Sequence, residues 1–536
     1  HRRCSRTIAA SRPYRGPVTT WTRRGVLGAG LLGALSACTS DGSDPSGAPS
    51  STAPSSTAPP STSSSGSPSG GKPPWAQLRR SVDGTLSLPG DASYDQVRLL
   101  ENPRYDGEHP LAVLSVASAA DVATGLAFAQ DQALPVAIRS GGHSYPGWSG
   151  GGKPKALVID VRPLDRVDVS GTTATIGAGA ALAHVYDVIG GAGRAIAGGS
   201  CPTVGIAGLT IGGGVGVLTR AMGLTCDAVT SMQVVTADGT VRTASAQEEP
   251  DLYWALRGGG GGHLGVVTSF ELTTVAAPTL STVYLEWPFD AASDVVTAWQ
   301  GWAPDADHRL WSTLKGLGGQ SHAGGPTLLL SGTWTGPASA FDAQLAGLLD
   351  HVPAPSTRST HVLGYRDAMM SYAGCATIPA DRCTTGPGGD LQREAFAATS
   401  HVAYDPLDAG GITDLVDQVQ DAQSSGLKEA GISIDALGGR VRDVAPDATA
   451  FVHRQALATV QYTATFPPGD AQAADAYVRG FRAAMTPHWG DHAYVNYADA
   501  TISDYRAAYF GANADRLAQA RTAYDPDGFF TQPQDY

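Results

Sequence analysis

The sequence predicts an α+β protein with two large folded regions. The chain has 536 residues, of which 42% are hydrophobic, and this is more than one hydrophobic core usually serves. Residues 113–144 (VLSVASAADVATGLAFAQDQALPVAIRSGGHS) follow the order strand, amphipathic helix, strand, glycine-rich loop. From about residue 279 onward, strand-like runs alternate with helical runs, which favours an antiparallel sheet covered by helices.

The first 73 residues are expected to lie outside the folded body. Residues 22–38 (TRRGVLGAGLLGALSAC) combine Arg23 and Arg24 with a short apolar stretch and Cys38, which is typical of a twin-arginine export signal with a lipobox. We therefore predict a signal over 1–37, a lipid anchor on Cys38 and a disordered Ser/Thr/Pro-rich tether over 38–73. An ordinary signal peptide with a chance cysteine is the alternative. The prediction places the protein outside the cytoplasmic membrane, attached to it only by lipid.

The charge and the cysteines exclude several kinds of partner. The formal net charge is −13, which argues against nucleic acid or an anionic membrane surface as a partner. Cysteine pairs of the CxxC type and histidines at zinc-ligand spacing are both missing from the sequence, so we predict no structural metal. Cys375 and Cys383 are close enough in sequence to form a disulfide in an oxidising compartment.

Three glycine-rich segments carry the strongest functional signal. They span residues 139–149 (RSGGHSYPGWS), 198–216 (GGSCPTVGIAGLTIGGGVG) and 251–270 (DLYWALRGGGGGHLGVVTSF). Backbone amides in such loops can bind the pyrophosphate of a long anionic cofactor without lysines. A Rossmann site at IGGGVG (211–216) is the alternative, but loop-like sequence and then a strand follow these glycines where a helix is required.

Together the three segments resemble the PCMH-type FAD-binding domain of the vanillyl-alcohol oxidase superfamily. Within it, the chain resembles the berberine-bridge-enzyme-like group, which includes bacterial oligosaccharide and secondary-metabolite oxidases. YVNYAD (494–499) and YFGANADRLAQARTAYDPDGFFTQPQ (509–534) match the closing segment of that group. The resemblance covers about residues 76–536. It implies a two-part FAD-binding domain over 74–278, a substrate domain with a large antiparallel sheet over 279–483, and a closing segment over 484–536 that returns to the FAD domain.

The resemblance also implies how FAD is held. His143 is expected to bond the 8α-methyl of the flavin and Cys201 to bond C6, with a single bond through His143 as the alternative. Asn496 is expected to touch the flavin or to hold its own loop, and Cys226 to be a buried structural thiol. The remaining residues expected along the pyrophosphate and the rest of the cofactor are Arg139, Ser140, Gly141, Gly142, Ser144, Gly205, Gly208, Gly212 and Val267.

Tyr497 is the implied base, with a cofactor-packing aromatic as the alternative. A free phenol has a pKa of about 10, so a base working near neutrality needs a lowered value. Tyr494, Arg440 and Arg454 are the candidates to lower it, and Asp435 is a candidate partner of the base.

The predicted reaction is hydride transfer from a sugar, oligosaccharide or glycoside ring hydroxyl to FAD, with O2 reduced to H2O2. The alternatives are a hydroxylated polyketide or alkaloid as substrate, a dehydrogenase with another acceptor, and a binding lipoprotein without catalysis. Several tryptophans are candidates to stack on sugar rings, although each also fits a packed core. They are Trp148, Trp287, Trp311 and Trp334.

Overall fold

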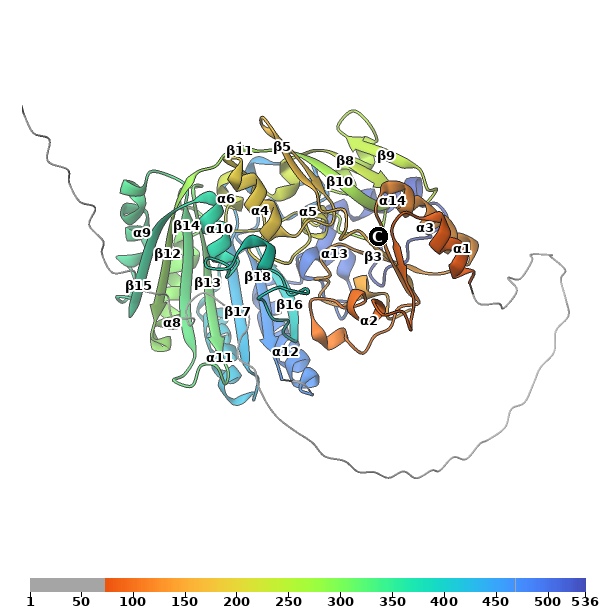
Figure 1. Cartoon of the computed structure of the whole chain (residues 1–536). Helices are drawn as coiled ribbons and strands as arrows, with labels where there is room; N and C mark the ends of the chain where they lie inside the picture. Colours follow the sequence, from red (N-terminus) through yellow and green to blue (C-terminus); the bar gives the residue numbers. More distant parts are fainter. Residues whose placement is uncertain (1–72, 468) are drawn as a thin grey trace, which may run out of the picture.

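The computed structural model describes residues 73–467 and 469–536, and it confirms the α+β class (Figure 1). A seven-stranded antiparallel sheet lies on the left of the view, and two smaller sheets lie on the right. The predicted export signal and nearly all of the tether fall outside the described residues. Among the described residues, no helix is both long and apolar enough to cross a membrane.

The first sheet has the order β1-β2-β4-β3, in which β2, β4 and β3 run parallel. Helix α3 (Ala119–Asp131) connects β2 to β3, and its first turn is capped by the Ser118 hydroxyl, which accepts from the Asp121 amide at 3.2 Å. The first glycine-rich loop therefore leaves the carboxyl end of a buried parallel strand. The strand bounds are β1 Thr85–Ser87, β2 Ala112–Ser115, β3 Val136–Arg139 and β4 Leu157–Asp160.

The second sheet is antiparallel with the order β5-β6-β10-β8-β9. The second glycine-rich segment enters the short helix α5 (Ile206–Ile211), while the third leads into β10 and includes its first residues. The strand bounds are β5 Val167–Ser170, β6 Thr173–Gly177, β8 Val229–Val235, β9 Val241–Ser245 and β10 Val266–Thr273. The helices of this region are α1 Trp75–Ser81, α2 Tyr94–Val97, α4 Leu182–Gly191, α6 Thr219–Met222 and α7 Pro250–Ala255.

The large sheet has the order β15-β12-β14-β13-β17-β18-β16. Alternation along each strand sends apolar side chains to one face, where Ile432 and Ile434 of β17 share a core with Val419 and Phe481 of the covering helices. The strands are β12 Thr279–Trp287, β13 Leu310–Gly318, β14 Thr327–Trp334, β15 Thr357–Gly364, β16 Phe396–Ala403, β17 Glu429–Ala436 and β18 Ala458–Thr465. The covering helices are α8 Ala292–Trp302, α9 Phe341–Leu349, α11 Ala409–Asp421 and α12 Ala471–Trp489.

The C-terminal segment returns from the large sheet to the first region. Helices α13 (Tyr505–Phe510) and α14 (Ala514–Tyr524) follow a short 3-10 turn, Val495–Tyr497. Phe510 and Leu517 belong to the same hydrophobic core as Leu252 of α7. This return path places the Tyr494–Tyr497 stretch between the glycine-rich loops and the large sheet. Helix α10 (Tyr365–Tyr372) packs on α4, and two-residue strands β7 (Arg194–Ala195) and β11 (Val275–Ala276) pair with each other.

Candidate active site

A cavity of about 2130 Å³ lies between the glycine-rich loops and the polar face of the large sheet. Pockets that hold one small molecule usually measure about 300–1,000 Å³, so this cavity has room for a dinucleotide cofactor and a substrate together. All three glycine-rich segments contribute to its wall. The predicted cofactor residues that line it are His143, Cys201, Ser140, Gly141, Gly142, Ser144, Gly205, Gly208, Val267 and Asn496.

The first two glycine-rich loops touch through their backbones. A Cβ on Gly141 would lie 2.1 Å from the amide nitrogen of Gly205, and a Cβ on Gly205 would lie 2.2 Å from the amide nitrogen of Gly141. Both positions therefore require glycine. By contrast, a Cβ on Gly208 would meet no described atom within 4 Å, so that backbone faces open cavity. Gly212 was also predicted to lie along the cofactor, but it does not line the cavity, because the Asn496 side chain covers it.

Arg139 does not reach the predicted pyrophosphate site, which corrects the expectation. Its guanidinium is fully buried, donates to the Asp160 carboxylate at 2.9 Å, and also donates to the carbonyls of Val97 and Arg98. A cation in a dry interior has to be paired, and Asp160 at the end of the neighbouring strand β4 supplies that pair. Arg139 therefore holds the end of β3 in place, while the amides of the loop after it face the cavity.

His143 and Cys201 meet at the hydroxyl of Thr203. The His143 Nε2 atom lies 2.8 Å from Thr203 Oγ1, and the Cys201 sulfur lies 4.0 Å from the same oxygen. Desolvation lowers the pKa of His143 to about 4, so the imidazole is neutral and nucleophilic at neutral pH. Cys201 is a free thiol exposed to the cavity, and the enclosing walls raise its pKa.

Tyr497 stands beside a second aromatic residue that sequence reasoning missed. The ring of Tyr145 stacks on that of Tyr497 at a centroid distance of 5.5 Å with an interplanar angle of 5°. Gln461 of β18 donates its side-chain amide to the Tyr145 hydroxyl, and Tyr105 donates to the Tyr145 carbonyl at 2.5 Å. The only sequence signal for Tyr145 is its place two residues after His143, in the same loop.

Asp435 is on the cavity face of β17, as the predicted strand alternation requires. It pairs in register with Thr313 of β13, and Lys315 lies two residues further along that strand on the same face. Burial raises the pKa of Asp435, whereas the Thr313 hydroxyl and the Lys315 ammonium oppose the rise. Lys315 was also missed, although the alternation of Trp311, Thr313 and Lys315 could have placed it beside Asp435.

Burial raises the pKa of Tyr497 well above its usual value, and the acidic groups of Tyr145, Asp435, Tyr494 and Cys201 raise it further. This corrects the expectation of a lowered pKa. The two arginines predicted to lower this pKa are both paired with other carboxylates. Arg440 is exposed and pairs with Asp443.

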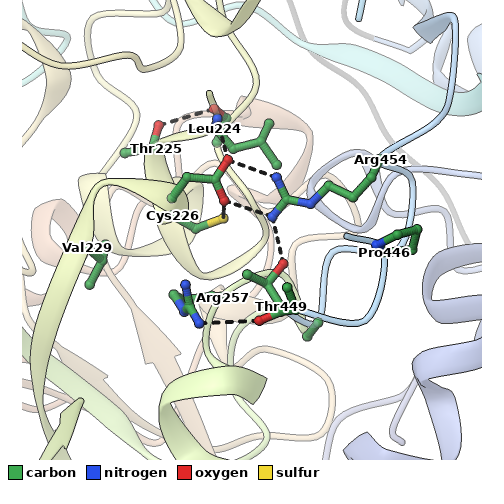
Figure 2. A network of polar contacts seen from close by, with 12 residues as sticks. Leu224, Thr225, Cys226, Val229, Arg257, Pro446, Thr449 and Arg454 are labelled. Atoms are coloured by element: carbon green, nitrogen blue, oxygen red, sulfur yellow. Dashed lines mark hydrogen bonds and ion pairs between the residues drawn. The ribbon is translucent and has the colours of Figure 1, made fainter. Parts of the chain in front are cut away.

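Arg454 is buried in the polar network shown in Figure 2. Its two terminal nitrogens each donate to an Asp227 oxygen at 2.8 Å, and one also donates to Thr449 at 2.7 Å. The Cys226 thiol is buried and lies 3.7 Å from an Asp227 oxygen, as expected of a structural thiol. The network joins the loop after α6 to the segment between β17 and β18. Arg454 is therefore a structural residue, not a partner of the base.

Tyr494 contacts Tyr497 edge to face at 5.0 Å but does not line the cavity. Its hydroxyl accepts from the amides of Gly214 and Val215 and from the Asn496 side chain. The same Asn496 amide nitrogen donates to the Leu209 carbonyl at 2.9 Å. The expectation that Tyr494 assists the base by lowering its pKa is therefore corrected: Tyr494 raises the pKa of Tyr497, and it fixes the turn after α5 against the C-terminal segment.

The remaining predictions have mixed outcomes. Cys375 and Cys383 form the expected disulfide. Of the four tryptophans, Trp287 and Trp334 are buried in the helix-covered core, although Trp287 also borders the cavity, and Trp148 and Trp311 line the cavity. Among the described residues there is no group of three or more histidine, cysteine, aspartate or glutamate side chains suited to a metal ion.

Comparisons with known proteins agree with this site. Residues 110–245 match the model of the FAD binding domain, and residues 493–535 match the model of berberine and berberine-like proteins. These matches define an FAD-linked oxidoreductase. The FAD-linked oxidoreductase YvdP of Bacillus subtilis is 30% identical over 462 residues, which cover 84% of this chain and 97% of that protein. The chain therefore belongs to the berberine-bridge-enzyme-like family of FAD-linked oxidoreductases.

Relatives with named substrates are similarly close. The xylooligosaccharide oxidase of Thermothelomyces thermophilus is 30% identical over 445 residues, which cover 79% of this chain and 86% of that enzyme. Among solved structures, Physcomitrella patens BBE-like 1 matches with a TM-score of 0.79 at 26% identity, over 86% of this chain and 98% of that chain. The carbohydrate oxidase of Microdochium nivale has a TM-score of 0.76 at 25% identity, with the same coverage.

The residues present fit FAD. The open backbone at Gly208, the neutral imidazole of His143 and the free thiol of Cys201 all face one cavity large enough for the cofactor. When bound, FAD supplies a two-electron acceptor for a hydride from substrate. The chain's own contribution is to position the cofactor through the loops and to present Tyr497, Tyr145 and Asp435 on the side of the cavity that the large sheet forms.

Proposed function

We propose that this protein oxidises a ring hydroxyl of a sugar, oligosaccharide or glycoside, with FAD as hydride acceptor and O2 as the final oxidant, so that H2O2 is released. The named substrates of the carbohydrate and xylooligosaccharide oxidases support this choice. The N-terminal motif supports export by the twin-arginine route and a lipid tether at Cys38.

The observation that carries the proposal is the polarity of the cavity wall. Trp311 of β13 also lines the cavity, on the side that the large sheet forms. A cavity wall with many hydrogen-bonding groups suits a substrate with many hydroxyl groups, because a buried polar group left unpaired costs about 1–3 kcal/mol. The sheet face of the cavity is rich in hydroxyl, amide and charged groups. They include Thr282, Tyr284, Lys315, Ser331, Ser433, Gln461 and Thr463.

The proposal assigns the proton transfer to the chain's own side chains. Tyr497 takes the hydroxyl proton of the substrate as the hydride leaves its carbon, and Asp435 receives the proton that Tyr497 gives up. The raised pKa values of both groups suit this order, because a group that holds its proton strongly is a strong acceptor once it is deprotonated. Tyr145 limits the movement of the Tyr497 ring by stacking on it.

The proposal also assigns two covalent bonds to FAD, one from His143 and one from Cys201. Denaturing the purified protein in acid, washing the pellet and measuring its spectrum and intact mass tests this directly. The mass of FAD should remain on the protein, and only the variant His143→Ala combined with Cys201→Ala should release all of it. Release of flavin from the wild-type protein would overturn the covalent attachment.

The substrate class is tested by oxygen uptake and H2O2 release with a panel of mono- and oligosaccharides, glycosides and hydroxylated aromatic compounds. Saccharides or glycosides should be turned over with one H2O2 for each O2 consumed. Turnover confined to the aromatic compounds would contradict the proposed class. Bleaching of the flavin by saccharide without oxygen uptake would instead indicate a dehydrogenase.

A further inference from the structure

The Thr203 hydroxyl joins three reactive side chains at the cavity wall. It lies 2.8 Å from His143 Nε2 and 4.0 Å from the Cys201 sulfur, and it interacts with the Glu101 carboxylate, which lines the same cavity. Thr203 is itself buried. One hydroxyl can accept one hydrogen bond while it donates another. A neutral His143 that donates from Nε2 therefore leaves the Thr203 hydroxyl proton available to the nearby Glu101 carboxylate and leaves Nδ1 of His143 with its lone pair.

Glu101 is held in place beside this hydroxyl. Its amide donates to the Gly142 carbonyl at 3.2 Å, which ties it to the residue before His143. Its carboxylate also accepts from the Thr385 hydroxyl at 2.8 and 2.9 Å. The segment around Thr385 belongs to the substrate region, so Glu101 is enclosed from both sides.

The charges that face Glu101 leave it able to take up a proton. Burial raises its pKa above the usual value, and the hydroxyls of Thr385 and Thr203 and the cations Arg393 and Arg162 oppose the rise. Each cation is already committed to another carboxylate, Arg393 to Asp106 and Arg162 to Asp160. The thiol of Cys201 is the acid that interacts with Glu101 across the cavity wall.

We propose that Glu101, acting through the Thr203 hydroxyl, accepts the proton that His143 or Cys201 gives up when it bonds to FAD. This inference rests on the covalent attachment in the proposed function. Each attachment replaces a cofactor C–H bond and a protein N–H or S–H bond by one C–N or C–S bond, which releases two protons and two electrons. The electrons pass to O2, which takes up two protons and becomes H2O2. The proton that leaves the protein side chain is the one assigned to Glu101.

In this relay, Glu101 and Thr203 assist the attachment of the cofactor. They are distinct from Tyr497 and Asp435, which act on the substrate. Four variants test it: Thr203→Val, Thr203→Ser, Glu101→Gln and Glu101→Asp. Each purified protein is incubated with excess FAD in air, and samples are quenched in acid over time. Intact mass and the flavin absorbance of the washed pellet give the covalently bound fraction, and fluorescence quenching of free FAD gives noncovalent binding.

Thr203→Val and Glu101→Gln should slow covalent attachment at least tenfold while they still bind FAD noncovalently. Thr203→Ser retains the hydroxyl and should attach FAD at close to the wild-type rate, and Glu101→Asp should recover part of the rate. Thr384→Val is the matched control, since it removes the hydroxyl next along the chain, which accepts from the Gly386 amide at 3.2 Å, and it should change the rate less than threefold.

The failures are distinguishable. Wild-type protein without covalent flavin overturns the attachment on which the inference rests. Wild-type protein that is covalently loaded, together with Thr203→Val and Glu101→Gln loaded at the same rate, overturns the relay alone. The relay is also overturned if Thr203→Ser attaches FAD as slowly as Thr203→Val, because that result would assign the effect to packing of the threonine methyl group. If Glu101→Gln fails to fold, the Thr203 pair still decides the question.

Discussion

The rings of Tyr145 and Tyr497 lie nearly parallel, with centroids 5.5 Å apart and planes 5° from each other. Tyr145 comes from the first glycine-rich loop and Tyr497 from the C-terminal segment, so the pair joins the cofactor wall to the return of the chain. Burial raises the pKa of both phenols. Tyr497 is therefore protonated at neutral pH, and it can accept a proton only if its own proton is passed to another group.

Replacing Tyr497 by phenylalanine tests its role as the base. We expect kcat to fall about 100- to 10,000-fold, because that is the usual contribution of a positioned general base. The flavin content should stay unchanged, and anaerobic bleaching of the flavin by substrate should slow by the same factor. Tyr477→Phe, on the helix-covered side of the sheet, is the control and should retain kcat. A Tyr497→Phe enzyme within threefold of wild type would assign Tyr497 to cofactor packing.

The acid limb of the pH profile should report Asp435. Burial raises the pKa of this carboxyl, and a protonated carboxyl cannot accept a proton, so kcat/KM should fall as the pH drops through that raised value. Asp435→Asn should be slow at every pH and should lack this limb. Lys315→Met should move the limb to higher pH, because removing the ammonium leaves the carboxylate less stable. A limb that shifts to lower pH in Lys315→Met would contradict the assignment.

Trp311 should affect substrate binding more than turnover. Its side chain lines the cavity on the side of the large sheet, so we expect a sugar ring of the substrate to pack against the indole. Trp311→Phe reduces the aromatic surface on the cavity wall, and we expect KM to rise about two- to tenfold with kcat nearly constant, since aromatic contacts contribute about 0.5–1.5 kcal/mol. Trp299→Phe is the matched control, since its indole donates to Ser312 in the core at 3.0 Å. An equal rise in KM for both variants would point to general loosening of the sheet.

The Asp227–Arg454 pair should matter for stability (Figure 2). Both oxygens of Asp227 accept from Arg454, whose side chain is fully buried. Asp227→Asn or Arg454→Met leaves one partner unpaired, which we expect to lower the free energy of unfolding by about 3–5 kcal/mol. Arg366→Ala breaks the more exposed pair with Asp187 and should cost about 1 kcal/mol or less. Denaturant titration measures both, and equal losses in the two pairs would contradict the role of burial.

The sequence allowed prediction of those parts of the site that local patterns determine. The glycine-rich loops, His143, Cys201 and Tyr497 are carried by contiguous motifs, and Asp435 follows from strand alternation. Arg139 was misplaced because its partner Asp160 lies on a neighbouring strand, 21 residues away. The pairing of Arg454 with Asp227 spans 227 residues, and it depends on how the substrate region docks on the loop after α6. Contacts of this kind have no periodicity or spacing from which to predict them.

Acid should destabilise the protein through its buried histidines. His401 is fully buried, its Nδ1 lies 2.7 Å from the Tyr462 hydroxyl, and burial lowers its pKa to about 3. An unfolded histidine has a pKa of about 6.5. Below that value the unfolded state binds a proton that the folded state does not, so stability is lost as the pH falls toward 3, by about 1.4 kcal/mol per pH unit for this residue.

The melting temperature should therefore decrease steadily between pH 6.5 and pH 4.5. His401→Gln should be less stable at pH 7 but should show a shallower decrease, because it removes one of the groups that protonate only on unfolding. His351→Asn changes an exposed histidine and should keep the wild-type slope. His453, whose pKa is also lowered to about 3, should retain its own share of the slope in the His401 variant. A His401→Gln protein with the full wild-type slope would show that the acid sensitivity arises elsewhere.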